Sequence, residues 1–286
     1  MAELELKRIL CPVDFSEHST KALRFAGRLA EALRTEVVVF HAQHYEFPIY
    51  FTAAQTEELK AQLRKNERAA RSYLDNYVND HLAPSVRRSV VLKEGDPVAE
   101  ILAALADYQV ELVVMGTHGR TGLTRVRLGS VMESVLRVAD VPVLSVGPRV
   151  SLPPAGTSFR RVLCSTDLRS HDHRTCEWAA KLAEMAGAEL AILHVDENGV
   201  IGDSPNEAIR QKLCDWVSPG IRGRCSEKQL IRQGNASQQI ATEASGADLL
   251  VVGAHQRSSI ETALFGSTTE TLVRTAPCPV LTIRHR

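Results

Sequence analysis

Short apolar runs alternate along the chain with longer segments in which apolar residues recur every three or four positions. Residues 8–15 (RILCPVDF) and 36–42 (EVVVFHA) are apolar, rich in β-branched residues and of strand length. Between them, apolar residues recur at helical spacing from Ala22 to Leu33, and Ser16, a residue type that caps helix starts, precedes them. This stretch therefore predicts a strand, a helix and a second strand in succession.

The same alternation continues through the first half of the chain. The further predicted elements are a long polar helix near 55–80, a strand at 88–95, a helix at 97–108, a strand at 111–116, a helix from Ser130 and a strand at 141–146. Continuously apolar strands interleaved with helices indicate a parallel sheet that helices cover on both faces. Such sheets bind ligands beyond the carboxyl ends of their strands, where the strand order reverses. Asp14 and Gly116 both lie at such ends, so we expect them to face one crevice.

The second half of the chain repeats the first. The segment RILCPVDFS, which contains Asp14, corresponds to RVLCSTDLR, which contains Asp167. Further on, ELVVMGTHG corresponds to DLLVVGAHQ, so Gly116 aligns with Gly253, and the second copy is shorter in its middle. The repeat predicts an α/β protein made of two tandem, doubly wound domains, each with a five-stranded parallel sheet.

The boundary between the copies is predicted near residue 150. Residues 147–158 (GPRVSLPPAGTS) collect Pro and Gly, a composition that breaks regular structure and is typical of linkers. We therefore place the first domain at residues 1–150 and the second at residues 151–286.

The loop GTHGRTGLTRVRLGS, residues 116–130, joins a predicted strand to a predicted helix. Its glycines follow the spacing Gly-x-x-Gly, nine residues, Gly, and Ser130 comes next. Glycine lets a ligand approach the backbone, and the free N–H groups at the start of a helix bind anions such as phosphate. The spacing alone is weak evidence, because glycines also serve turns and close packing. The loop matches neither the Walker A pattern nor G-x-G-x-x-G.

Charge and apolar run lengths exclude several classes of protein. The 34 basic and 34 acidic residues balance, which disfavours bulk binding to nucleic acid or to an anionic membrane. No apolar run approaches the roughly 18 residues of a membrane span, and the start MAELELKRIL lacks the basic flank and apolar core of a signal peptide. We expect a soluble, cytoplasmic protein with no nucleic-acid or membrane partner.

The cysteines and histidines do not form a metal-binding pattern. The six cysteines are scattered without a C-x-x-C pair, which favours reduced thiols over a disulfide or zinc framework. His171, His173 and Cys176 are close in sequence, but one helix cannot turn all three toward one metal ion. His41 and His194 end equivalent strands. The sequence leaves open whether they have a structural role or line the crevice.

Two long motifs resemble the universal stress protein family in its tandem form. They are CPVDFSEHSTKALRFAGRLA from Cys11 and VVMGTHGRTGLTRVRLGSVMESVLRVADVPVLSV from Val113, and the second half carries a copy of both. The resemblance covers nearly the whole chain. It implies a Rossmann-like fold in which the last strands, 141–146 and 278–283, meet across a pseudo-twofold axis and form an intramolecular pseudo-dimer.

The resemblance also implies an ATP site in the first copy, with or without Mg²⁺. ATP-binding members carry Gly-x-x-Gly, nine residues, Gly-[Ser/Thr], and residues 116–130 match every fixed position. By this resemblance, Pro12, Val13 and Asp14 would frame the adenine, and Met115 would lie along it. Ala42 stands where the family commonly has Val, which trims the apolar wall beside the adenine.

The rest of the implied site concerns ribose and phosphate. Gly116 would lie along the ribose, Gly119 and Gly129 would approach the phosphates by their backbone, and Ser130 and Val131 would bind phosphate at the helix start.

The second copy keeps only part of this pattern. Asp167, Gly253, Gly266 and Ser267 are present, but Gln256 replaces the second glycine. If that position requires a positive φ, Gln costs on the order of 1 kcal/mol there, and its side chain would fill phosphate space. We expect a competent first site and a weak or empty second one.

Two functions remain open at this point. One is an ATP-binding stress-response regulator that acts through nucleotide-dependent conformation or assembly, with an unidentified protein partner; a homodimer is left open. The other is a nucleotide-independent scaffold, which would have no physical reason to need the intact glycine loop. The loop shows no carboxylate pair for Mg²⁺ and no evident general base, so no catalytic residue is assigned. Slow ATP hydrolysis or self-phosphorylation, for instance at Ser130, is implied only by the resemblance.

Overall fold

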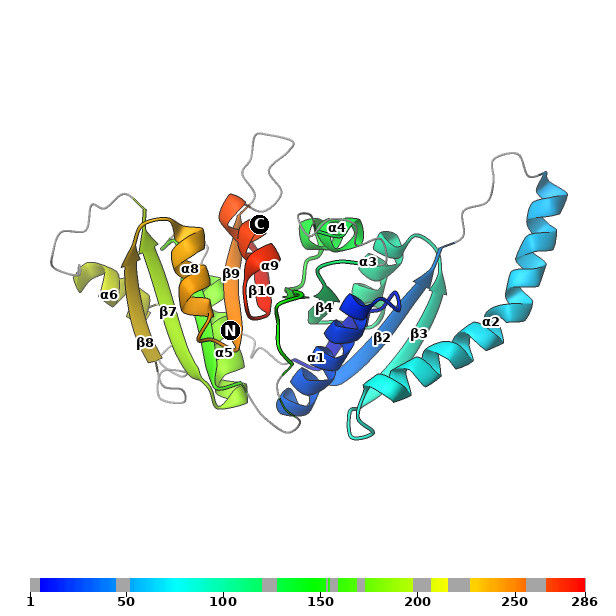
Figure 1. Ribbon diagram of the computed structural model, residues 1–286, viewed down its shortest axis with the longest axis horizontal. Coiled ribbons are helices and arrows are strands. Elements are labelled where there is room, and N and C mark those ends of the chain that lie inside the picture. The colour runs from blue at the N-terminus through cyan, green and yellow to red at the C-terminus, as the bar shows by residue number, and fades with distance from the viewer. Residues whose placement is uncertain are drawn as a thin grey trace.

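The fold is a single mixed sheet covered by helices (Figure 1). The computed structural model describes residues 6–44, 52–119, 128–152, 154, 159–168, 173–197, 207–215, 227–255 and 266–285. The elements of the first half are β1 (Arg8–Pro12), α1 (Glu17–Leu33), β2 (Glu36–Gln43), α2 (Ala53–His81), β3 (Arg88–Glu94), α3 (Pro97–Asp107), β4 (Leu112–Gly116), α4 (Ser130–Val138) and β5 (Val143–Val146). The elements of the second half are β6 (Arg161–Thr166), α5 (His173–Ala186), β7 (Glu189–Asp196), α6 (Glu207–Asp215), β8 (Glu227–Gln233), α8 (Ala236–Ala244), β9 (Leu249–His255), α9 (Ser267–Thr275) and β10 (Val280–His285).

The two halves share one topology and one continuous sheet. The strand order is β3-β2-β1-β4-β5-β10-β9-β6-β7-β8, so each half has five strands in the same relative order. All neighbouring strands within a half are parallel, whereas β5 and β10 pair antiparallel, with Leu144 opposite Leu281. The Ser145 hydroxyl also donates to the carbonyl of Val280 at 3.0 Å across this junction. The predicted pseudo-dimer is thereby confirmed, with its two sheets merged into one.

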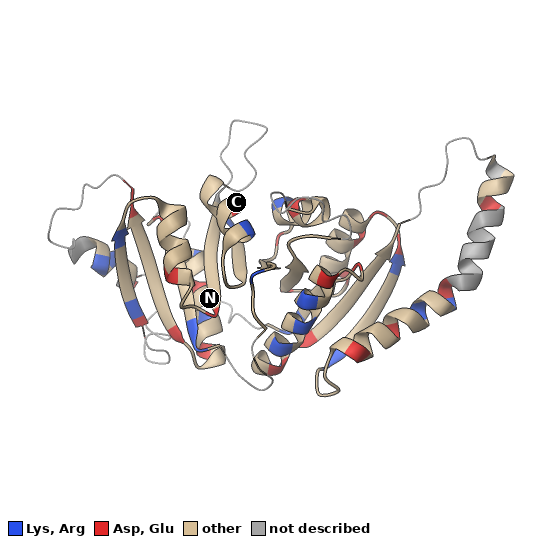
Figure 2. Ribbon diagram, viewed as in Figure 1, with Lys and Arg blue, Asp and Glu red and all other residues tan. Residues whose placement is uncertain are grey.

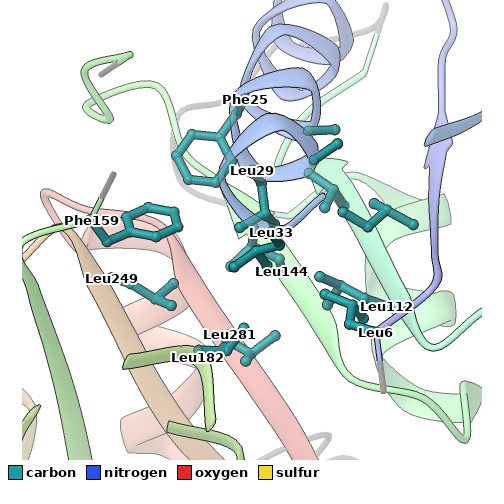
Figure 3. Packing of buried hydrophobic residues seen from close by; sticks show 14 of the residues in the cluster. Leu6, Phe25, Leu29, Leu33, Leu112, Leu144, Phe159, Leu182, Leu249 and Leu281 are labelled. Atoms are coloured by element: carbon teal, nitrogen blue, oxygen red, sulfur yellow. The ribbon is translucent and has the colours of Figure 1, made fainter. Parts of the chain in front are cut away.

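Helices cover both faces of the sheet, as the apolar strands predicted. One buried cluster lies between the sheet and α1, α2, α5 and α6, and the other lies between the sheet and α3, α4, α8 and α9. The first cluster runs across the junction of the halves, where Phe25 of α1 faces Phe159 with ring centroids 5.9 Å apart (Figure 3). Leu144 and Leu281 extend the same packing below these rings. The halves therefore share a core as well as a sheet.

The excess length of the first copy lies between β2 and β3, the stretch that contains α2. This helix has 29 residues, whereas α6, at the matching place in the second half, has 9. The C-terminal part of α2 packs on the body of the domain through Leu74, Tyr77 and Val78. Its N-terminal part extends away from the sheet in Figure 1. The predicted helix at 55–80 is confirmed, and it is two residues longer at its start and one at its end.

The surface carries both signs of charge. Lys and Arg lie among Asp and Glu in both halves (Figure 2), in keeping with the balanced composition. Over the described residues, no helix is both long enough and apolar enough to cross a membrane. The segment between β5 and β6 contains the boundary that the sequence predicts near residue 150.

Candidate functional site

A cavity of about 470 Å³ opens at the point where the strand order of the first half reverses. There β1 lies between β2 and β4. The chain runs from β1 to α1 on one face of the sheet and from β4 to α4 on the other. Open α/β sheets bind ligands at such points. The volume falls within the range of small-molecule sites, roughly 300–1,000 Å³.

The structure brings all the predicted first-copy residues together around this cavity. They are Pro12, Val13, Asp14, Ala42, Met115, Gly116, Gly119, Gly129, Ser130 and Val131. They come from the ends of β1, β2 and β4 and from the start of α4. Nucleotide binding by these residues stays a prediction.

Several lining residues were not predicted from the sequence. Phe40 and Met132 are buried in the wall, and Pro97 and Ile101 contribute the first turns of α3. The signal for α3 was present, because its Asp-Pro start follows a predicted strand, and helix starts after strands face the carboxyl edge of the sheet. The apolar wall is therefore larger than the motif residues alone suggest.

Asp14 contributes the one carboxylate among the described lining residues. Its Oδ1 accepts hydrogen bonds from the backbone N–H of Ser16 at 3.0 Å and from the Ser16 hydroxyl at 2.6 Å. Ser16 also caps α1, as predicted, by accepting from the N–H of Ser19. The carboxylate is thus held at a fixed place at the end of β1.

The residue that follows this carboxylate is strained in both halves. Phe15 has a φ of 63°, and Leu168, which follows Asp167, has the same φ. A non-glycine residue in this region costs on the order of 1 kcal/mol or more, and such residues cluster at ligand sites. The Phe15 ring packs against His41, Tyr73 and Tyr77, with centroids 4.5–5.0 Å apart. This packing holds the turn in its strained form.

His41 has both of the roles that the sequence left open. Its Nδ1 donates to the carbonyl of Val13 at 2.7 Å, which fixes the ring against β1, and the residue also lines the cavity. His194 makes the same contact in the second half, with the carbonyl of Thr166 at 3.0 Å.

The three glycines of the Gly-x-x-Gly, nine residues, Gly pattern differ in how much room the protein leaves for a side chain. A Cβ at Gly116 would lie 2.8 Å from the backbone oxygen of His18, so α1 packs too closely for any side chain there. A Cβ at Gly119 would lie 2.9 Å from Oδ2 of Asp14. A Cβ at Gly129 would come no closer than 3.5 Å, to the nitrogen of Gly119, which is ordinary contact.

The backbone at Gly119 differs from the positive φ considered for this position. Gly119 does not have a positive φ, so the strain argument for Gln256 does not apply. The glycine is required by the nearby Asp14 carboxylate instead. Gln256 itself lies outside the described residues, as do the arginines at 120, 125 and 127.

The start of α4 lines the cavity and has no side-chain cap. Ser16, Thr52, Asp96 and Asn235 cap α1, α2, α3 and α8 with their side chains. By contrast, α4 begins after Gly129 with no side-chain cap, although Gly129 has ordinary backbone angles (φ −62°, ψ 141°). The first N–H groups of a helix need partners, and the helix end is positive. Helix starts of this kind favour anions.

The second half has the same framework with different detail. Asp167 follows β6 but is exposed, whereas Asp14 is half-buried. Gly253 lies within β9, and its carbonyl accepts from the Thr269 hydroxyl at 3.0 Å. Gly266 has a φ of 81°, and α9 begins at Ser267 without a side-chain cap. The predicted second-copy residues are therefore at equivalent strand and helix ends, but the glycine at 266 is required by its own backbone.

No metal centre is found among the described residues, where no group of three His, Cys, Asp or Glu side chains could hold an ion. Cys176 is wholly buried, and His173 is exposed and lies 3.3 Å from Glu177. His171 lies outside the described residues, so the predicted divergence of His171 from His173 stays a prediction. The four cysteines with described side chains are free thiols.

The fold and this cavity define a tandem α/β protein with a ligand-sized cavity at the switch point of its first half. Residues 5–147 and residues 158–284 each match the model of the universal stress protein family. The chain therefore belongs to the universal stress protein family and carries two copies of its domain.

Individual relatives support this assignment. A universal stress protein of Mycolicibacterium smegmatis is 27% identical over 297 aligned positions, which cover 97% of each chain. A second, from Methanocaldococcus jannaschii, is 32% identical and covers 49% of this chain and 81% of its own. A crystal structure of a universal stress protein from Archaeoglobus fulgidus superposes with a TM-score of 0.73 at 24% identity, over 98% of this chain and 99% of that one. This last likeness concerns the fold alone.

Proposed function

We propose that the first half binds an adenine nucleotide, ATP with or without Mg²⁺, in the cavity at the ends of β1, β2 and β4. We further propose that the protein acts as a stress-response regulator whose conformation or assembly depends on this nucleotide. One observation carries the proposal most directly: the cavity combines an apolar wall, a fixed carboxylate and an uncapped helix start.

The apolar part of the cavity suits a planar base. Val13 and Met115 line the cavity and are almost fully buried, and Ile101 adds to the wall from α3. Ala42 leaves more room than a valine would, as the sequence indicated. The carboxylate of Asp14 is an acceptor at this end, and an exocyclic amine of a base is a matching donor.

The other end of the cavity suits phosphate. The backbone N–H groups at Ser130 and Val131 lie in the first turn of α4, which has no side-chain cap. Gly129 has no conformational need to be glycine, and nothing in the described protein crowds its missing Cβ. The absence of a side chain there keeps space next to the helix start for a ligand. A Mg²⁺ ion would arrive with the phosphates and keep several of its waters, because the described residues offer it no ligand cluster.

Binding is favoured over efficient catalysis at this site. Asp14 is the one acidic residue in the described lining, and its Oδ1 is already engaged by Ser16. Phosphoryl transfer depends on metals and positioned charges that this lining does not supply.

We propose that the second site is weak or empty. Its aspartate, Asp167, is exposed. At the position of Gly119, where a Cβ would lie 2.9 Å from the carboxylate, the second copy has Gln256. An equivalent loop path there would force the Asp167 carboxylate aside.

The test is to denature the purified protein and quantify the released nucleotide per chain by chromatography. The natural chain and Gly129→Val are compared, with Gly147→Ala as control, because a Cβ at Gly147 meets nothing within 4 Å. We expect about one ATP per chain in the natural protein and the control, and much less in Gly129→Val. If no nucleotide is released and direct titration with ATP and Mg²⁺ also fails, the scaffold function stands in its place.

A further inference from the structure

Two cysteines face each other in the core of the second half. Cys164 lies in the middle of β6, and Cys176 lies in the first turn of α5. Both side chains are wholly buried, and the Cys164 thiol donates a hydrogen bond to the sulfur of Cys176 with the two sulfurs 3.6 Å apart. Neither residue lines the cavity described above.

The first half has no counterpart of this pair. Cys11 occupies the position of Cys164, but Leu23 occupies the position of Cys176 in the aligned repeat. Cys11 and Cys278 are buried, and this burial raises the pKa of each thiol, that of Cys278 to about 12. Burial alone keeps such thiols protonated and slow to react, so they serve as internal references for the pair, in which one sulfur hydrogen-bonds the other.

We propose that Cys164 and Cys176 form a reversible disulfide when the protein meets hydrogen peroxide. One sulfur, as thiolate, attacks the O–O bond, becomes a sulfenic acid and releases hydroxide, which takes up a proton to give water. The partner thiol then attacks the sulfenic sulfur, the S–S bond forms, and a second water leaves. The peroxide is reduced to two waters, and the two thiols are oxidised together.

The geometry supports this pairing. A disulfide joins sulfurs about 2.05 Å apart, so the two atoms approach by less than 2 Å from their present contact. A thiolate at either sulfur accepts a hydrogen bond from the other thiol, which stabilises its charge. Cys176 also lies where the helix begins, and helix ends open locally at low cost, which gives peroxide a route to buried sulfur.

The bond would change the region of the second half that corresponds to the nucleotide site. It would close the segment from Cys164 to Cys176, which includes Asp167. In the same turn of α5, the Thr175 hydroxyl lies 2.9 Å from Nε2 of His285 near the end of β10. Oxidation would therefore fix the start of α5 against β6 in the half whose glycine pattern is incomplete.

The test uses the full chain, treated with hydrogen peroxide under native conditions, then acid-quenched, denatured and alkylated. We expect four of the six cysteines to remain alkylatable, a Cys164–Cys176 cross-linked peptide on mapping, and full reversal by dithiothreitol. The oxidised chain should unfold at a temperature higher by roughly 5–10 °C, because the cross-link constrains the unfolded state.

The matched variant is Cys176→Leu, which installs the residue found at this position in the first half. It should form no cross-link under the same treatment, whereas Cys278→Ala should form it as the natural chain does. Peptide mapping of the natural chain decides the question even if Cys176→Leu folds poorly. The proposal is overturned if all six thiols of the peroxide-treated protein can be alkylated after denaturation, or if the cross-link joins other cysteines.

Discussion

The contact between Gly116 and α1 gives a prediction for Gly116→Ala. An added Cβ would lie 2.8 Å from the oxygen, 2.9 Å from the carbon and 3.2 Å from the Cβ of His18. The first two are backbone atoms, so no side-chain rotation relieves the overlap. The end of β4 is fixed by pairing with Val146, and α1 is fixed by its buried face, so strand and helix must move apart by several tenths of an ångström.

The expected cost follows from these distances. Overpacking of this kind costs about 1–3 kcal/mol. Alanine also restricts the unfolded chain more than glycine does, which offsets roughly 0.4–1 kcal/mol of this overpacking cost. The net loss is therefore about 1–2 kcal/mol, which lowers the unfolding midpoint by roughly 2–8 °C at about 2–4 °C per kcal/mol for a domain of this size.

Thermal unfolding followed by circular dichroism, without added nucleotide, measures this loss. Gly147→Ala is the control, because its new Cβ would meet nothing within 4 Å and its midpoint should not fall. If Gly116→Ala unfolds at the natural temperature, the close approach of α1 to β4 is refuted, and the glycine must be explained by ligand contact instead.

Three further results are expected. Gly129→Ala should keep the natural unfolding midpoint but bind ATP at least tenfold more weakly by isothermal titration calorimetry, because a loss of about 1.4 kcal/mol in binding free energy gives a tenfold change. Unchanged affinity would show that the phosphates do not lie beside Gly129. Tyr77→Phe, which removes the 2.7 Å hydrogen bond to Thr20, should lose about 1 kcal/mol in urea unfolding, and no loss would argue against that bond. Burial raises the pKa of Tyr77 in the folded protein above its ordinary value of 10.0, because it disfavours the charged phenolate. The neutral phenol therefore contributes fully to the free energy of unfolding below about pH 10, and this contribution is lost as pH rises through the folded pKa. The natural chain should therefore lose stability above pH 10 more steeply than Tyr77→Phe, and parallel pH profiles would contradict this.

Periodicity and the internal repeat predicted most of the fold. Continuously apolar strands are buried on both faces in a parallel sheet, so their helices had to lie on both sides. The Ser16 cap and the long helix near 55–80 were readable from local pattern alone. The merging of the halves was predicted only by family resemblance, because nothing in VPVLSV or CPVLTI specifies which edge it meets.

The sequence predicted which motif residues line the cavity, but not the physical reason for each of them. Spacing identified three glycines but could not separate Gly116, which avoids His18, from Gly129, which avoids nothing in the described protein. That difference depends on how closely α1 approaches β4, a tertiary distance. The wall from Pro97 and Ile101 was missed for the same cause, since it depends on which helix start borders the cavity.

The most direct test of the central proposal is a titration of the nucleotide-free chain with ATP and Mg²⁺, read by calorimetry and by the protection of α4 amides from hydrogen exchange. We predict one ATP per chain, with protection at Ser130 and Val131 and none at Ser267. Two equivalent sites, or binding that leaves the start of α4 unprotected, would contradict a single nucleotide site in the first half.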